Sequence, residues 1–331
     1  MTSPYLVCLS FVLLLSACGR GHSTAPTSET STPAQSTPQP PAERESNSTP
    51  APEVSTSEIP YTKDKRLSYA GYLITVERKR VKVEEFNAEN EVAVLRKNGR
   101  IIGAFDAVRH PLGGFTRLAL APVLGDRYKQ LVIEQTGPRA WACWVVALKP
   151  TFRVVFKSTE YPVDHELGAE DLDGDGVREL LMTLNTFWFF DGLCGACSPR
   201  FDIAFKYDQT RGGFRPANHI LNGLCDTADQ LAQAEQTIKL WQSENPDLIS
   251  NPVKASELYS RVLVHALPLL YCGSENLGWS FFDRLYNLPD REVRKSRIKR
   301  ALRRDRVYRV IQNDLKRTSR QASLHRVRMS G

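Results

Sequence analysis

One short acidic segment has residue types and spacing that could do chemistry. It runs Asp171-Leu-Asp173-Gly-Asp175-Gly176-Val177-Arg-Glu179, with carboxylates at relative positions 1, 3, 5 and 9. Calcium prefers six or more oxygen ligands, and alternating aspartates on a tight turn can converge on one centre. Gly176 would supply the sharp bend and position 7 a backbone carbonyl. The pattern indicates a calcium loop, and the alternative is a solvated acidic turn without an ion.

The residues after this segment indicate which kind of calcium loop it is. An EF-hand needs a glutamate at position 12 and a helix beyond it, but this chain has Met182 within a strand-like stretch. The loop instead resembles the calcium β-loops of FG-GAP and VCBS-type repeats, which run into a hydrophobic strand. The resemblance covers this loop and its strand. It implies four side-chain ligands and one carbonyl ligand, in chain order Asp171, Asp173, Asp175, Val177 (carbonyl) and Glu179.

The segment has a partial second copy earlier in the chain. Gly125-Asp126-Arg-Tyr-Lys-Gln130-Leu131-Val132-Ile133 aligns with Gly174-Asp175-Gly-Val-Arg-Glu179-Leu180-Leu181-Met182 at an offset of 49 residues, a blade-like period. The earlier copy has Pro122 and Leu124 in place of Asp171 and Asp173, so we expect it to bind no metal. Seven blades would need roughly 350 residues, more than this chain has, so the sequence excludes a closed seven-bladed propeller. It predicts instead two or three blade-like units packed on helices.

Hydrophobic patterning divides the rest of the folded chain into two parts. Residues 61–217 contain short segments rich in β-branched and aromatic residues, and Asn98-Gly99 between two of them is typical of a hairpin turn. Helical spacing begins after position 217, behind Asp226 and Thr227, and recurs behind Asp290 and Asp305. We predict an α+β fold, in which an antiparallel β-domain of blade-like repeats over 61–217 precedes an α-helical subdomain over 218–331. The predicted strands are Tyr72–Val76, Glu91–Leu95, Ile101–Phe105, Leu118–Ala121, Gln130–Glu134, Trp144–Leu148, Val154–Lys157, Leu180–Leu184 and Phe201–Tyr207.

The N-terminal residues predict export. Residues 1–17 contain an apolar run, Tyr5–Ala17, which is typical of a signal peptide. The run ends on Leu15-Ser16-Ala17-Cys18, which resembles the lipobox of bacterial lipoproteins, although no Lys or Arg precedes it. The resemblance implies that Cys18 is diacylated and anchors the mature protein to the cell envelope, on the outer membrane in a Gram-negative host. A non-lipidated signal peptide or a plain membrane anchor is the alternative.

Residues 18–60 predict a tether. They are mostly Ser, Thr, Pro, Ala and Glu, and up to position 60 they contain no Phe, Trp or Tyr. Such a composition buries too little apolar area to offset the entropy of ordering, so we expect disorder. About 40 residues of flexible chain would reach roughly 35 Å.

Five cysteines remain outside the leader. They are Cys143, Cys194, Cys197, Cys225 and Cys272. In an oxidising compartment they allow two disulfides and one free thiol, with the pairing left open. Cys194-Gly-Ala-Cys197 is similar to a thioredoxin-type CxxC motif, but loop-forming residues surround it. We expect a structural disulfide there, and a metal site, a redox site or free thiols are the alternatives.

Charge is unevenly distributed along the chain. The whole protein has a net charge of +7, whereas residues 284–331 contain 16 Lys and Arg against 4 Asp and Glu. An excess of positive charge indicates an anionic partner. Composition does not choose between lipid headgroups, wall polymers and nucleic acid. We expect an anionic envelope polymer or lipid and no specific nucleic acid, and the alternative is a solvated helix face.

Motifs for catalysis are scarce. The sequence has no HExxH, no GxSxG and no phosphate-binding glycine loop. We therefore predict a lipid-anchored envelope protein with a non-catalytic binding or scaffold role and a structural calcium site. The alternative is an envelope hydrolase or carbohydrate-active enzyme whose acidic residues lie between Asp164 and Glu179. Such an enzyme needs one carboxylate with a raised pKa beside another that stays charged.

Overall fold

The structure is a computed structural model that describes residues 59–83, 86–107, 114–125, 128–137, 140–221 and 223–329. Cys18, the predicted leader, most of the predicted tether and Asp126 lie outside these residues.

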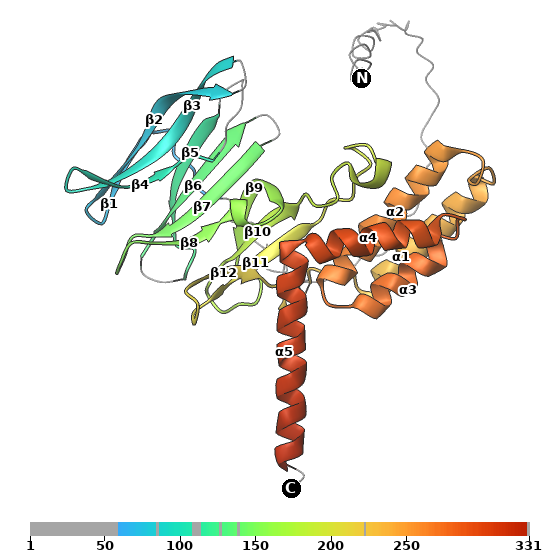
Figure 1. The fold of residues 1–331 in the computed structure, drawn as a ribbon. Coiled ribbons are helices and arrows are strands. Elements are labelled where there is room, and N and C mark those ends of the chain that lie inside the picture. The colour runs from blue at the N-terminus through green and yellow to red at the C-terminus, as the bar shows by residue number, and fades with distance from the viewer. Residues whose placement is uncertain are drawn as a thin grey trace, which may run out of the picture. The chain divides into compact units, whose positions relative to one another are not determined.

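Three antiparallel four-stranded sheets follow one another along the chain, and strands of adjacent sheets contact each other (Figure 1). The first contains β1 (Arg66–Tyr69), β2 (Tyr72–Val83), β3 (Phe86–Lys97) and β4 (Arg100–Phe105). The second contains β5 (Phe115–Ala121), β6 (Gln130–Gly137), β7 (Ala140–Ala147) and β8 (Arg153–Lys157). The third contains β9 (Val163–Glu170), β10 (Glu179–Leu184), β11 (Asp202–Asp208) and β12 (Gly213–Pro216). Each sheet pairs its strands in chain order, as a propeller blade does. The predicted antiparallel β-domain is confirmed.

The first sheet shows how local sequence sets strand register. Asn98 and Gly99 both have positive φ, at 50° and 76°, which a two-residue hairpin turn requires and which these two residue types accept. Lys97 pairs with Arg100 on either side of the turn. The hairpin predicted from Asn98-Gly99 therefore joins β3 to β4.

The second sheet is buried on both faces, because its side chains alternate between two cores. On β6, Leu131 and Ile133 join a core shared with the first sheet, whereas Val132 between them joins a core shared with the third sheet and the helices. A strand of period two with both faces covered becomes a continuous apolar run. Leu131, Val132 and Ile133 are accordingly all fully buried.

The chain turns helical after the last strand. The helices are α1 (Ala228–Glu244), α2 (Pro252–Tyr271), α3 (Glu275–Leu285), α4 (Arg291–Arg304) and α5 (Arg306–Met329), and short 3-10 helices lie at Ser158–Glu160 (η1), Phe190–Gly192 (η2) and Asn218–Ile220 (η3). Thr227 caps α1, because its side chain accepts from the N–H of Gln230 while Gln230 bonds back to the Thr227 N–H. The predicted helical part is confirmed.

The helices and the third sheet share one hydrophobic core. Phe205 on β11 and Leu258 and Val262 on α2 are fully buried and belong to the same cluster. Packing therefore continues across the boundary predicted at 217. Among the described helices, none combines the length and the hydropathy that a membrane span requires.

Candidate functional site: an acidic loop on the third sheet

The acidic segment forms the connection between β9 and β10. Gly174 and Gly176 have φ of +74° and +83°, a left-handed conformation that favours glycine, so both bends depend on this residue type. The loop leaves β9 at Glu170 and enters β10 at Glu179. Glu170 pairs directly with Glu179 across the two strands, so the strand ends hold the loop closed.

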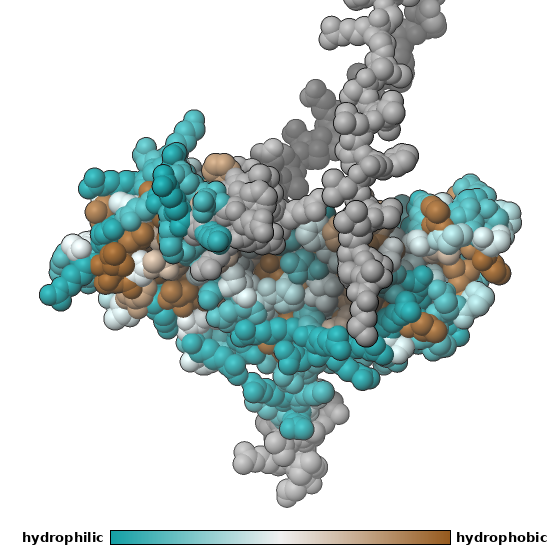
Figure 2. Space-filling view, turned by 45° about the horizontal axis from the view of Figure 1, so that its top comes forward, coloured by the Kyte–Doolittle hydropathy of each residue, from teal (hydrophilic) through white to brown (hydrophobic). Residues whose placement is uncertain are grey.

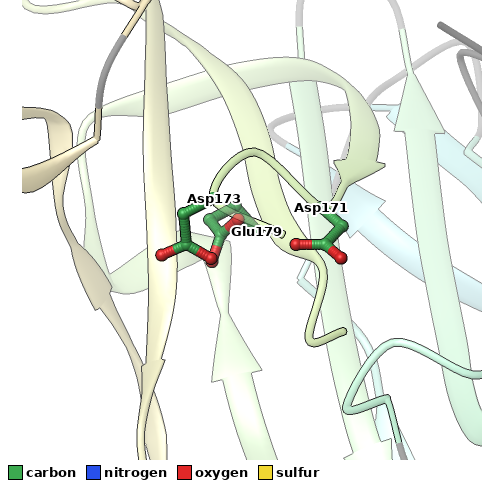
Figure 3. A group of neighbouring side chains, drawn as sticks. All are labelled: Asp171, Asp173 and Glu179. Atoms are coloured by element: carbon green, nitrogen blue, oxygen red, sulfur yellow. The ribbon is translucent and has the colours of Figure 1, made fainter. Parts of the chain in front are cut away.

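Three carboxylates of the loop converge on one point (Figure 3). One oxygen from each of Asp171, Asp173 and Glu179 lies within 4.8 Å of the others. Oxygen ligands of a calcium ion lie about 2.4 Å from it, so two ligands on opposite sides are about 5 Å apart. Asp171 and Asp173 are exposed, whereas Glu179 is fully buried. The spacing suits a divalent cation held between the loop surface and the buried start of β10.

Backbone N–H groups orient the loop carboxylates. The carboxylate of Asp171 accepts hydrogen bonds from the N–H groups of Gly174 and Gly176, both at 2.9 Å. The carboxylate of Asp175 accepts from the Val177 N–H at 2.8 Å. These bonds fix the side chains of positions 1 and 5 along the turn. Asp175 does not belong to the three-carboxylate group.

The ammonium of Lys206 lies among the same carboxylates. Its Nζ donates to Asp173 Oδ2 at 2.5 Å and to Asp175 Oδ2 at 2.6 Å. It also lies 3.3 Å from Oε1 of Glu179. The register of the sheet explains this position, because Leu180 on β10 pairs with Phe205 on β11 and the next residues are Glu179 and Lys206. One positive charge therefore contacts three of the four loop carboxylates.

Burial and this ion pairing shift the pKa values of the loop in opposite directions. Burial raises the pKa of Glu179, although the Leu172 N–H and Lys206 both favour its charged form. The hydrogen bond from Lys206 lowers the pKa of Asp175. Burial opposes the charge on Lys206, but its bonds to Asp173 and Asp175 outweigh burial and raise its pKa. These ion pairs therefore favour the charged form of Lys206.

The earlier copy of the loop, between β5 and β6, shows how the same turn is closed by a neutral side chain. Gln130 begins β6 as Glu179 begins β10, and its side-chain oxygen accepts from the N–H of Leu124 at 2.9 Å. Its side-chain nitrogen donates to the carbonyl of Tyr128 at 2.7 Å. At the offset of 49 residues, Tyr128 corresponds to Val177. A single amide thus binds both sides of the earlier loop.

Glu179 can make only half of that arrangement. Its carboxylate accepts from the Leu172 N–H at 2.9 Å, but an ionised carboxylate has no proton to donate to the Val177 carbonyl. A cation can bind carboxylate and carbonyl oxygens together. The second sheet also lacks a counterpart to Lys206, because Leu131 pairs with Val146 and the residue beside Gln130 is Ala147. The exchange of glutamine for glutamate therefore accompanies a change from a loop closed by a neutral side chain to one whose carboxylates face a cation, Lys206.

The two copies of the loop contact each other. The N–H of Arg178 donates to the Val123 carbonyl at 2.9 Å. A Cβ added to Gly125 would lie 1.9 Å from the Gly176 carbonyl oxygen, so the approach of the two backbones requires glycine at position 125. The earlier loop thus supports the later one, and its sequence resemblance corresponds to equivalent places in neighbouring sheets.

Other acidic residues near the loop are engaged in separate contacts. Asp164 is buried and bonds to Nδ1 of His165. Glu166 lies 2.7 Å from the guanidinium of Arg117, which also bonds to Glu134 at 2.7 Å. Glu166 and Glu170, but not Asp164, line a cavity of about 750 Å³. The acidic residues between positions 164 and 179 therefore lie in three places, namely the acidic loop, the contact of Asp164 with His165, and the lining of this cavity.

Sequence reasoning missed the buried Glu134 beside this cavity. Glu134 is 1% exposed, and its two oxygens accept bonds from Tyr61 and Arg117. Burial raises the pKa of Glu134, against the effect of both bonds. A charged residue inside the apolar run of β6 was the available signal. Because both oxygens are already bonded inside the protein, we assign Glu134 to holding Tyr61 against the β-domain.

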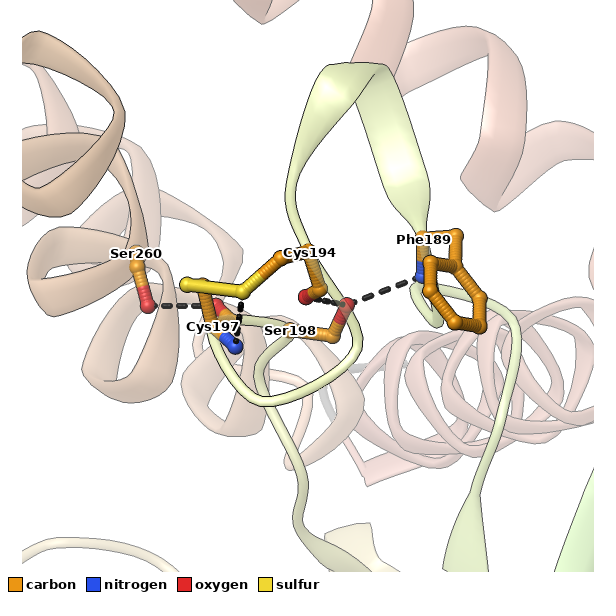
Figure 4. Close-up of a disulfide and its surroundings, with 5 residues drawn as sticks. All are labelled: Phe189, Cys194, Cys197, Ser198 and Ser260. Carbon is orange, nitrogen blue, oxygen red and sulfur yellow. Dashed lines mark hydrogen bonds between the residues drawn. A yellow bond between two sulfur atoms is a disulfide. The ribbon is translucent and has the colours of Figure 1, made fainter. Parts of the chain in front are cut away.

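The cysteines form two disulfides, Cys194–Cys197 and Cys225–Cys272, and Cys143 is a buried free thiol whose pKa is raised by burial. Cys194–Cys197 lies in the loop between η2 and β11 (Figure 4). The Cys197 N–H donates to Cys194 Sγ at 3.1 Å, and Ser260 Oγ on α2 donates to the Cys197 carbonyl at 2.5 Å. The motif therefore connects this loop to α2. A thioredoxin-type CxxC begins a helix, whereas this one is followed by a loop and then by β11.

Comparison with known proteins adds no relative. No protein-family model, curated protein or solved structure matches the chain. The interpretation of the acidic loop therefore rests on its own geometry and on its internal copy.

Proposed function

We propose that this chain is a lipid-anchored protein of the cell envelope, with a non-catalytic binding or scaffold role and one structural calcium ion in the 171–179 loop. The observation that carries the calcium site is the convergence of Asp171, Asp173 and Glu179 within 4.8 Å. Asp175 and the Val177 carbonyl complete the proposed ligand set. When bound, the ion would supply the positive charge that joins the loop to β10.

Lys206 decides how tightly the loop would bind calcium. Its ammonium already bonds to Asp173 and Asp175, so an ion has to displace it. The side chain is 24% exposed on a flexible four-carbon stem, so it can move toward solvent. Calcium offers two charges and six or more coordination positions, which match four carboxylates better than one ammonium does. Lys206 is then the cation that holds the loop in the absence of calcium.

We expect calcium to stabilise the folded chain. A ligand that binds only the folded state adds about 2.7 kcal/mol at a hundredfold excess over Kd, which corresponds to roughly 5 °C or more in Tm for a domain of this size. Thermal unfolding in calcium should therefore occur above thermal unfolding in chelator, with a smaller effect of magnesium, which needs a tight octahedral shell. Asp173→Ala should abolish the calcium response. Asp208→Asn, on the neighbouring strand outside the loop, should retain it.

The variant Lys206→Met distinguishes a calcium site from an acidic turn that Lys206 neutralises without any metal. If calcium competes with the ammonium, this variant should be less stable than wild type in chelator and should show the larger calcium shift. If Lys206 is the resident counter-charge of an acidic turn, the variant should be destabilised equally in calcium and in chelator. Identical wild-type melting curves in both conditions would contradict the proposed calcium site.

The lipid anchor has its own test. The small residues before Cys18 resemble a lipobox, so we expect Cys18 to be the first residue of the mature protein and to bear a diacylglyceryl group. Mass spectrometry of membrane-extracted protein should detect this modified N-terminus, and Cys18→Ala should remove it. An unmodified mature N-terminus at another position would refute the anchor.

The contacts of the other acidic residues favour the scaffold role over the hydrolase alternative. Glu166 pairs with Arg117, Asp164 bonds to His165, and Glu134 is held by two internal bonds. Glu134 has the raised pKa expected of a general acid, but its oxygens are not available to a substrate in this arrangement. We therefore assign these carboxylates to fixing the β-domain.

A further inference from the structure

A hollow of about 580 Å³ lies where α3, α4 and α5 meet. Trp279 on α3, Leu302 on α4 and Tyr308 on α5 contribute apolar surface to it. Leu302 and Tyr308 are buried, so the floor belongs to the helical core. Beyond this junction, hydrophilic side chains cover the described part of α5 where it leaves the body of the molecule (Figure 2).

Four cationic side chains line the hollow, namely Lys299 and Arg303 on α4 and Arg309 and Lys316 on α5. Within the described residues, none of the four forms an ion pair. Other cations of the same helices do, as Arg294 and Arg297 show by pairing with Asp191. Among the described residues, Arg300 and Arg304 on α4 and Arg320 on α5 also form no ion pair, but they do not line the hollow. What distinguishes the four lining cations is therefore their common concave place.

The hollow holds one opposing charge and one buried donor. Glu275 lies at its edge and accepts from Nε1 of Trp279 at 3.4 Å, which leaves a local excess of three positive charges. Nε2 of Gln312 is buried in the same lining and has no hydrogen-bond partner among the described residues. A buried amide donor without an acceptor is unfavourable, so a bound acceptor would stabilise it.

The aromatic floor helps to position one of the cations. Nζ of Lys299 lies 5.2 Å from the ring centre of Trp279, a cation–π arrangement. Arginine guanidinium groups present paired N–H donors that match two oxygens of one phosphate, and lysine adds a compact charge. Cations, a neutral amide donor and a concave floor together form a site for an oxyanion.

We propose that the hollow between α3, α4 and α5 binds a phosphate group through Lys299, Arg303, Arg309, Lys316 and Gln312. A terminal phosphate carries up to two negative charges near neutral pH and a phosphodiester carries one, and both have several strong acceptor oxygens that the cations and the amide donor can bind. The phosphate can belong to a free phosphorylated molecule or to a phospholipid headgroup. This inference deepens the envelope role proposed above and does not depend on calcium.

The test is calorimetric titration of the detergent-solubilised full chain in chelator. The titrants are inorganic phosphate, pyrophosphate and glycerophosphoglycerol, which is phosphatidylglycerol without its acyl chains. The variant Arg303→Gln/Arg309→Gln removes two donors of the hollow. The matched control, Arg300→Gln/Arg304→Gln, removes the same charge from α4. Arg300 and Arg304 each follow a lining cation, Lys299 or Arg303, by one residue, which is about 100° round the helix axis.

We expect at least one titrant to bind, with Kd raised at least tenfold in the hollow variant and less than twofold in the control. Binding of glycerophosphoglycerol identifies a headgroup as the source, and binding of phosphate or pyrophosphate alone identifies a free ligand. Lys316→Gln, at an exposed position, repeats the comparison if the double variant fails to fold. Equal weakening by both double variants, or no binding of any titrant, would overturn the site. Neither result would affect the calcium and lipidation tests.

Discussion

Replacing both Cys225 and Cys272 with alanine should lower the free energy of unfolding by about 4 kcal/mol, because their disulfide closes a long loop in the unfolded chain. The two cysteines are 47 positions apart. Cys225 precedes the cap of α1 and Cys272 follows the end of α2, so the bond fixes this helix pair. Denaturation in urea followed by circular dichroism should show the loss as a lower transition midpoint.

The other disulfide is a control within the same chain. Cys194 and Cys197 are 3 positions apart, so their bond restricts the unfolded chain much less. The same loop-closure relation gives about 2 kcal/mol for a loop this short. Cys194→Ala/Cys197→Ala should therefore lose about half as much stability as the Cys225 and Cys272 variant. Equal losses would contradict loop closure as the source of the stabilisation.

Local patterns predicted the elements of the fold because each depends on neighbouring residues. The turn at Asn98-Gly99 needs two residues that accept positive φ, and the start of α1 needs an oxygen at Thr227 and an amide at Gln230. Both signals lie within a few positions of each other in the sequence. The order of strands then followed from short connections, which make consecutive strands neighbours.

The acidic loop was predicted from its spacing, but its main partner was not. Lys206 reaches Asp173 and Asp175 only because β10 and β11 pair in one particular register. A shift of one residue would place its side chain on the other face of the sheet. Register depends on packing across the whole domain, so one sequence gives no direct signal for it. The contacts of Glu134 with Tyr61 and Arg117 could not be predicted for the same reason, because they also join residues far apart in the sequence.

The two copies of the loop differ in a way that their alignment did not reveal, namely in the hydrogen bonds that Gln130 and Glu179 form. Gln130 and Glu179 differ by one polar group, and the alignment placed them together. Only the structure shows that the amide of Gln130 binds a carbonyl of its own loop, a bond that Glu179 cannot make. Pro122 and Leu124, in place of Asp171 and Asp173, predicted a loop without metal, and the hydrogen bonds of Gln130 supply a physical reason why that loop needs none.

A second large loss of stability is expected at Asp305, where one buried carboxylate joins three parts of the fold. The sequence predicted only that a helix begins behind it. In the structure, Oδ1 of Asp305 accepts from the Tyr308 N–H at 3.0 Å and caps α5. Oδ2 accepts from Tyr271 on α2 at 2.8 Å and from Thr186, which follows β10. Asp305 is 3% exposed, so water cannot replace these bonds without local opening.

Asp305→Ala should lower the free energy of unfolding by about 3 to 5 kcal/mol, because it leaves three donors without an acceptor and each buried one costs about 1 to 3 kcal/mol. The control is Asp290→Ala, at the start of α4. Its side chain is 45% exposed, so its bonds to Tyr286 and Arg294 can be replaced by water, and we expect a loss of about 1 kcal/mol. Urea denaturation of both variants measures the difference. Similar losses would contradict burial as the source of the larger effect, because the Asp290 side chain is half-exposed and forms no capping bond.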